Sequence, residues 1–298
     1  MSIPPPRAAR AVGSHRLAEG PVWDPVRERV LWVDIPAGRI RTATLTSDGD
    51  LAPAEQVSVG GSVGAVAVSA DDHWIIAGAT GILQRDASGL ITAGARVLPG
   101  DSGRRLNDGK PDPAGRFVVG SLRSDGDSST EVLVRIESDD SVTTLDDDLA
   151  LSNGLAWTRD GSCMFSVDTL RRVIHRRSYD PSSGGVGPRT DFAHVDDGLP
   201  DGICLDAEEH LWVAIWGRGE VRRLSPSGDH VDTVTVPAPL VSSVAFVGKD
   251  LRSMVITTAA GGLTTAERQR HPLSGHLFLT EPDTPGLPMT AWSRTERG

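Results

Sequence analysis

The chain has 298 residues, of which 23% are charged, and its 33 glycines and 20 prolines are spread along the whole length. A formal net charge of −10 argues against nucleic acid as a partner, because proteins that bind phosphate backbones usually present a basic face. The apolar runs are short and bounded by turn residues, which predicts an all-β protein without a membrane span.

The first ten residues, MSIPPPRAAR, lack the apolar core of a signal peptide, so we expect a cytoplasmic protein. The two cysteines, Cys163 and Cys204, lie far apart in predicted strands and are interpreted as packing residues. The eight histidines show no paired metal-binding spacing and are interpreted as surface or packing residues.

A short pattern recurs six times along the chain: one residue, then a small residue, then a short apolar strand. In chain order the copies are EGPVWD, VGAVAVS, DGKPDP, NGLAWT, DGICLD and, more weakly, SSVAFV. Their second residues are 20, 64, 109, 154, 202 and 243, so the successive gaps are 44, 45, 45, 48 and 41 residues. A period of about 45 residues is typical of propeller blades with four strands each.

The unit that begins at Asp201 shows its four strands plainly. They are ICLD, LWVAIWG, EVRRLS and HVDTVTV, separated by AEEH, a glycine turn and PSGD. One such sheet cannot bury both of its faces, whereas six in a ring can. The sequence therefore predicts a six-bladed β-propeller of four-stranded antiparallel blades, with residues 1–298 as a single domain.

Two β-sandwiches are the rival fold, but nothing between residues 140 and 160 resembles a linker. The short apolar runs also lack the 3.6-residue period of helices. A ring must be fastened where its ends meet. The candidate fastener is SGHLFLTEP (274–282), paired beside the N-terminal strand around AVGSHRLAEG (11–20). Which strand completes which blade is left open.

Equivalent positions at the mouths of the innermost strands converge on the central channel of a propeller. The residue before the small residue is, in chain order, Glu19, Val63, Asp108, Asn153, Asp201 and Ser242. Crowded carboxylates repel one another, and a divalent cation would offset this cost. Oxygen ligands suit Ca, Mg or Mn, and tolerate Zn or Fe(II). The alternative is that Asp or Asn before Gly only forms turns, although that reading does not cover Glu19.

These motifs resemble the regucalcin and gluconolactonase family (SMP-30/gluconolactonase/LRE-like) of six-bladed propellers. The matching stretches are AEGPVWDP with LWVDIPAGRI (18–40), RLNDGKPDPAGRFVVGSL (105–122), LSNGLAWTRDG (151–161), LPDGICLDAEEHLWVAIWGRGEVRRLSPSG (199–228) and PLSGHLF (272–278). The resemblance spans nearly the whole chain. It implies one divalent cation on the axis, held by Glu19, Asn153 and Asp201.

The resemblance also implies that Arg105 and Asn107 hold sugar hydroxyls, since both side chains offer fixed donors. Without the resemblance, the motif NDGK is interpreted equally well as a turn. Asp108 is expected to contact the metal or, in an outer shell, its waters. The chain departs from the family at Pro111, where a small apolar residue is common, and in the segment RSDGDSSTE, where Asp125 aligns with an acidic substrate contact.

The family opens cyclic esters, especially aldonolactones such as gluconolactone, so the expected partner is a small sugar lactone. A cation would polarise the lactone carbonyl, and Asp201 is the expected general base. The cation also weakens Asp201 as a base, so a cation-activated water is an alternative source of the nucleophile. Ser, His and Asp are plentiful, but no spacing ties any three of them together, and the one GxSxG match, GGSVG (60–64), precedes a predicted strand instead of a helix, so a serine hydrolase is not supported.

Two other functions stay open at this point. One is a non-catalytic, calcium-type cation-binding protein with a regulatory role, which needs the metal ligands but not Arg105 or Asn107. The other is hydrolysis of different lactones or esters at the same site. We expect a monomer, because one chain supplies the whole ring.

Overall fold

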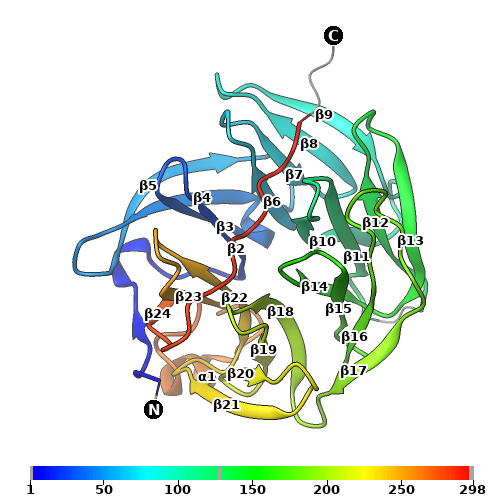
Figure 1. Cartoon of the computed structure of the whole chain (residues 1–298). Coiled ribbons are helices and arrows are strands. Elements are labelled where there is room, and N and C mark those ends of the chain that lie inside the picture. The colour runs from blue at the N-terminus through cyan, green and yellow to red at the C-terminus, as the bar shows by residue number, and fades with distance from the viewer. Residues whose placement is uncertain (1–2, 127–128, 295–298) are drawn as a thin grey trace.

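Short apolar runs separated by turns form six four-stranded antiparallel sheets, which surround a central axis (Figure 1). The structure is a computed structural model that describes residues 3–126 and 129–294. The predicted six-bladed β-propeller is confirmed, and the alternative of two sandwiches is wrong.

In the first three blades the strands follow one another from the axis outward, in chain order. Blade 1 contains β2 (Ala18–Asp24), β3 (Arg29–Asp34), β4 (Arg39–Leu45) and β5 (Leu51–Ser58). Blade 2 contains β6 (Ala65–Val68), β7 (Trp74–Ala77), β8 (Gly81–Arg85) and β9 (Ile91–Arg96). Blade 3 contains β10 (Arg104–Pro111), β11 (Phe117–Arg123), β12 (Glu131–Ile136) and β13 (Val142–Leu149).

The next two blades follow the same plan, and the sixth combines both ends of the chain. Blade 4 contains β14 (Ser152–Trp157), β15 (Cys163–Asp168), β16 (Val173–Ser178) and β17 (Thr190–His194). Blade 5 contains β18 (Leu199–Leu205), β19 (Leu211–Trp216), β20 (Glu220–Leu224) and β21 (His230–Thr235). Blade 6 contains β22 (Val241–Val247), β23 (Ser253–Thr258), β24 (Phe278–Thr280) and β1 (Arg7–Ala8).

Helical structure is sparse in the described ranges. It comprises two 3₁₀ turns, Arg10–Val12 and Ile35–Ala37, and the short helix α1 (Thr265–Arg270). None of these elements has the length and apolarity that crossing a membrane requires.

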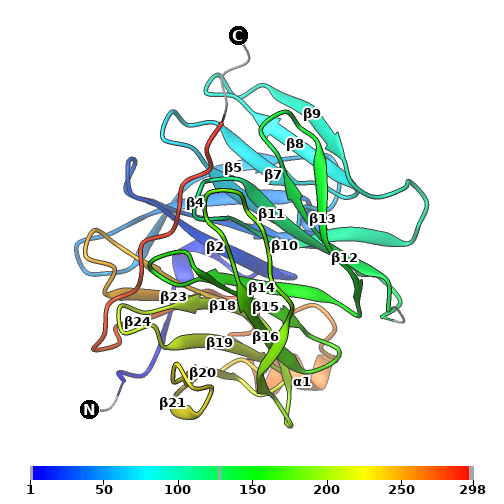
Figure 2. The same cartoon turned by 45° about the vertical axis from the view of Figure 1, so that its right-hand side comes forward.

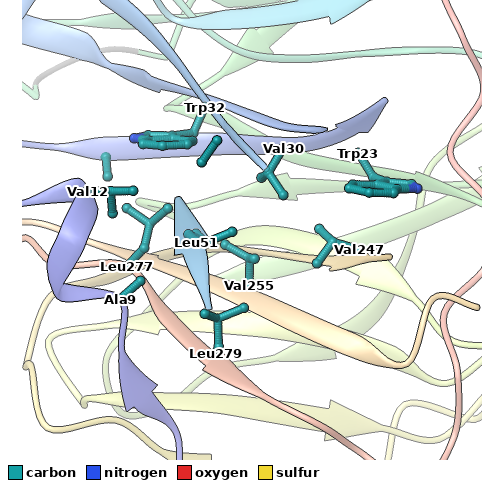
Figure 3. Packing of buried hydrophobic residues seen from close by; sticks show 12 residues of the cluster. Ala9, Val12, Trp23, Val30, Trp32, Leu51, Val247, Val255, Leu277 and Leu279 are labelled. Atoms are coloured by element: carbon teal, nitrogen blue, oxygen red, sulfur yellow. The ribbon is translucent and has the colours of Figure 1, made fainter. Parts of the chain in front are cut away.

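The N-terminal strand β1 closes the ring by pairing with β24, with Ala8 opposite Phe278. The expected fastening by the C-terminal segment is therefore confirmed, but the paired N-terminal strand lies upstream of residues 11–20. The N-terminal and C-terminal segments also contact each other beyond the paired strands, where the His15 amide donates to Gly275 O at 2.8 Å. In Figure 3, Val12 and Leu277 pack beside Trp32, whose Nε1 donates to His15 Nε2 at 3.0 Å.

The segment after β24 crosses the propeller at the far ends of the inner strands (Figure 2, red). It is held by the Leu287 amide, which donates to Leu205 O at 3.0 Å, and by the Trp292 amide, which donates to Val68 O at 3.0 Å. Because these acceptors end β18 and β6, the segment covers the end opposite the strand mouths.

Both cysteines are free, and each packs against a hydrophobic core cluster, as expected. Burial raises the pKa of the Cys204 thiol to about 12, so this thiol is not reactive at neutral pH.

Candidate metal and substrate site

The inner strands are irregular where the repeat pattern begins. Pairing shifts register between Glu19 and Val22, Leu106 and Gly109, Asn153 and Leu155, Pro200 and Ile203, and Val241 and Ser243. In blade 2, whose equivalent residue is the apolar Val63, β6 pairs with β7 without such a shift. A bulge turns a side chain out of the regular ladder. The polar residues of the pattern therefore lie at positions where the strand can aim them into the channel.

The small residue of the pattern is required by close approach between neighbouring inner strands. A Cβ placed on Gly154 would lie 2.5 Å from Asp201 O, and one on Gly202 would lie 2.1 Å from Ser243 Oγ. Each glycine therefore lets the next blade bring its own site residue to the axis.

Four of the converging residues form a buried polar cluster. Glu19, Asp108, Asn153 and Asp201 are each 5–7% exposed. Burial, and secondarily the charge of Asp108, raise the pKa of Glu19 to about 8. Burial followed by the charges of Glu19 and Asp108 raises the pKa of Asp201 well above its usual range, and burial raises the pKa of Asp108. The three carboxyl groups are thus close enough to oppose one another's ionisation.

The backbone amides near these groups satisfy some of the carboxylate oxygens and leave a buried oxygen of Asp201 without a donor. Glu19 Oε2 accepts the Gly20 amide at 2.9 Å, and Asp108 Oδ1 accepts the Gly109 amide at 2.8 Å. Asp201 Oδ1 is buried and has no hydrogen-bond partner. An unpartnered buried carboxylate oxygen among raised-pKa carboxyls is the environment that a divalent cation stabilises. The donor set fits a hard cation, with Glu19, Asn153 and Asp201 as the residues that would hold it.

The remaining positions of the pattern contribute no free ligand. Val63 is apolar and fully buried. Ser242 donates its hydroxyl to Ala18 O at 2.6 Å and so fastens blade 6 to blade 1. Deeper in the channel, Lys110 Nζ donates to Leu155 O at 2.8 Å and to Ile203 O at 3.0 Å. The ammonium group of Lys110 therefore lies beneath the acidic cluster.

Arg105 lies beside the acidic cluster, and its charge lowers the pKa values of Glu19 and Asp201. Its Nη1 donates to Asn107 Oδ1 at 2.8 Å, while Asn107 Nδ2 donates to Ser152 O at 2.9 Å. The amide of Asn107 therefore orients Arg105. Burial lowers the pKa of Arg105 to about 10, so the guanidinium remains charged at neutral pH.

Asp125 lies outside this cluster. It follows β11 at the same end of the propeller as the mouth of β10, but its side chain is 57% exposed and pairs with Arg123 at 2.9 Å. The substrate contact expected from the alignment stays a prediction.

A second acidic group, which sequence reasoning missed, contains Asp206, Glu208 and His210, with ligand atoms within 4.8 Å of one another. Its charge is already compensated, because Asp206 Oδ2 accepts from Trp212 Nε1 at 2.9 Å and from Arg223 Nε at 2.8 Å.

The position of Asp206 also repeats in other blades as a turn cap. Asp206 Oδ1 accepts two turn amides, as do Asp24 and Asp112 after the inner strands of blades 1 and 3. We interpret the group around Asp206 as structural, which leaves the axial cluster as the better cation site.

Residues 17–260 match the profile of the SMP-30/Gluconolactonase/LRE-like region. The chain belongs to this family. It is 35% identical over 250 residues to a pentonolactonase of Haloferax volcanii, covering 83% of each chain. It is 34% identical over 277 residues to a 6-deoxy-6-sulfogluconolactonase of Pseudomonas putida, covering 91% of this chain and 92% of the relative.

Among solved structures, the chain is similar to a calcium-binding regucalcin of Agrobacterium tumefaciens, with a TM-score of 0.90 and 25% identity over 98% of both chains. The resemblance inferred from the motifs is confirmed at the level of the family. The named relatives are lactonases and a calcium-binding protein, so the family sets the chemistry that this site must be tested for.

Proposed function

We propose that the protein is a divalent-metal-dependent hydrolase that opens sugar lactones, in particular aldonolactones such as gluconolactone. The observation that carries the proposal is the buried, unpartnered Oδ1 of Asp201 within a cluster of raised-pKa carboxyl groups beside the Arg105 guanidinium. The lactonases among the relatives support the reaction class.

Glu19, Asn153 and Asp201 would hold the cation through side-chain oxygens. When bound, a divalent cation would polarise the lactone carbonyl and stabilise the negative charge that develops on its oxygen. The chain itself excludes most water, since the three residues are nearly buried.

Asp201 is the proposed general base. One of its carboxylate oxygens would hold the cation, and the other would accept the proton of the attacking water. The cation would lower the pKa of Asp201, so a cation-activated water is the alternative source of the nucleophile. Arg105 is the proposed donor to sugar hydroxyls, and the contact from Asn107 holds its guanidinium in one orientation.

The experiment is a panel of aldonolactones, assayed by acid release at pH 7.5 in metal-free buffer. Each lactone is tested with EDTA and after addition of Ca²⁺, Mg²⁺, Mn²⁺, Zn²⁺ or Fe²⁺. We expect turnover that EDTA abolishes and one or more cations restore. Asp201→Asn serves as the inactive control, and Glu28→Gln, on the exposed surface, serves as the matched active control.

A protein that binds a cation at Glu19 and Asp201 yet opens none of the lactones would contradict the catalytic proposal. That result would favour a calcium-type binding protein. Turnover of aromatic lactones or phosphotriesters without turnover of aldonolactones would instead retain the site and replace the substrate.

A further inference from the structure

Thr169 is a buried polar residue at the end of β15 that neither the repeat pattern nor the family motifs single out. It is 5% exposed. Its backbone is fixed by a turn, because its amide donates to Leu151 O at 3.0 Å and its carbonyl accepts the Arg172 amide at 3.0 Å. The position of its hydroxyl is therefore set by the backbone.

The hydroxyl links two of the residues proposed to surround the cation. Thr169 Oγ1 donates to Pro200 O at 2.8 Å, immediately before Asp201, and accepts from Asn153 Nδ2 at 3.2 Å. A hydroxyl has one proton, and a carbonyl can only accept. Since that proton goes to Pro200 O, the group facing Thr169 from Asn153 must be a donor. The hydrogen bonds thus assign the amide orientation of Asn153.

The other end of the amide obeys a matching constraint. The Gly154 amide donates to Asn153 Oδ1 at 3.3 Å. This is the same contact that Gly20 makes with Glu19 and that Gly109 makes with Asp108. Asn153 Oδ1 therefore occupies, in blade 4, the place that a carboxylate oxygen occupies in blades 1 and 3.

Two acceptors hold this orientation. The NH₂ end of the Asn153 amide donates to Thr169 Oγ1 and also to the Asp201 carboxylate. A cation requires the oxygen end of the amide. An amide released from Thr169 would keep only its contact with Asp201, which a cation bound to that carboxylate would weaken.

We propose that Thr169 is a positioning residue of the cation site: its hydroxyl locks the Asn153 amide with Oδ1 available for the cation and ties that amide to the strand carrying Asp201. This inference rests on the proposed function, because it assumes that Asn153 is a ligand. Groups that orient metal ligands typically change affinity 10- to 100-fold when removed.

The test compares Thr169→Val, which has nearly the same shape and no hydroxyl, with Thr169→Ser, which keeps the hydroxyl. Ca²⁺ and Mn²⁺ binding is measured by calorimetry in metal-free buffer. We expect about 10- to 100-fold weaker binding for the valine variant and a change within about threefold for serine. The matched control is Thr42→Val in blade 1, where Thr42 Oγ1 accepts the Glu55 amide at 2.9 Å away from the axis, and we expect its affinity to be unchanged.

A double-mutant cycle provides a second measurement that a purely structural role would not move. In Asn153→Asp, both side-chain ends are oxygens, so orientation no longer matters. We expect Thr169→Val to cost less than about threefold in that background. An equal loss in both backgrounds would overturn the positioning role, as would equal losses for Thr169→Val and Thr42→Val.

Glu19→Gln separates this inference from the proposed function. If Glu19→Gln weakens binding and Thr169→Val does not, the positioning role alone is wrong. If the wild-type protein binds neither cation, or if Glu19→Gln leaves binding unchanged, the proposed cation site is wrong. The inference about Thr169 is then wrong as well.

Discussion

The metal-free protein is expected to carry an electrostatic cost that Glu19→Gln removes. Burial and the charge of Asp108 raise the pKa of Glu19 from 4.5 to about 8 in the folded chain. A folded-state pKa above the unfolded value contributes stability below pH 4.5, and this contribution is lost as the pH rises through 8. Glutamine keeps the shape of the side chain and has no charge to lose.

The magnitude follows from the pKa shift of Glu19. A rise from 4.5 to about 8 corresponds to roughly 5 kcal/mol once Glu19 is fully ionised, and to about 1 kcal/mol at pH 5. For a chain of 298 residues, the unfolding entropy near 60 °C is about 0.6 kcal/mol/K. Glu19→Gln should therefore raise Tm by about 8 °C at pH 8.5 and by less than about 2 °C at pH 5.

The assay is differential scanning calorimetry in EDTA at both pH values, with Glu28→Gln as the exposed control. Adding excess Ca²⁺ or Mn²⁺ should stabilise wild type and leave Glu19→Gln nearly unchanged, since ligand binding stabilises only the protein that binds it. A variant less stable than wild type at pH 8.5 in EDTA, or an equal Tm difference at both pH values, would refute the reasoning.

Asp201→Asn should reduce kcat for a turned-over lactone by at least about 100-fold while the circular dichroism spectrum stays that of wild type; a smaller loss would assign the base elsewhere. Arg105→Ala should raise KM without weakening Ca²⁺ binding, because it removes a sugar contact and a positive charge, and a weakened cation site would contradict this. Leu277→Ala, at a fully buried closure position, should lower the free energy of unfolding by about 2–5 kcal/mol in a urea titration; a loss below about 1 kcal/mol would show that ring closure does not depend on this packing. Burial lowers the pKa of His15, so its contribution to stability is present above pH 6.5 and is lost as the pH falls, and an NMR titration should place its midpoint below 6.5.

The sequence by itself determined the fold and the set of residues on the axis. The period of about 45 residues can be read from the sequence because each of the first five blades is one continuous segment that repeats the same strands and turns. Glu19, Asp108, Asn153 and Asp201 could therefore be grouped from their place in the repeat alone. The alternative interpretation of Asp and Asn before Gly as turn formers is wrong, because Asp108, Asn153 and Asp201 lie within strands and the glycines that follow them do not adopt positive φ.

Only the tertiary structure decided how these side chains are aimed and held. The bulges in the inner strands arise from the pairing of two strands. The hydrogen bonds from Asn107 to Ser152 O and from Thr169 to Pro200 O join residues of different blades. The tertiary structure also decided the closure of blade 6 by β1.

The physical reason is that a repeat records which residues each blade needs to form its own sheet. Hydrogen bonds and charge interactions between blades are sensitive to changes of a few tenths of an ångström in the distance between the blades. No pattern within the sequence of one blade specifies these distances. The acceptor left unpartnered on Asp201, from which the proposed chemistry follows, is a property of the closed ring.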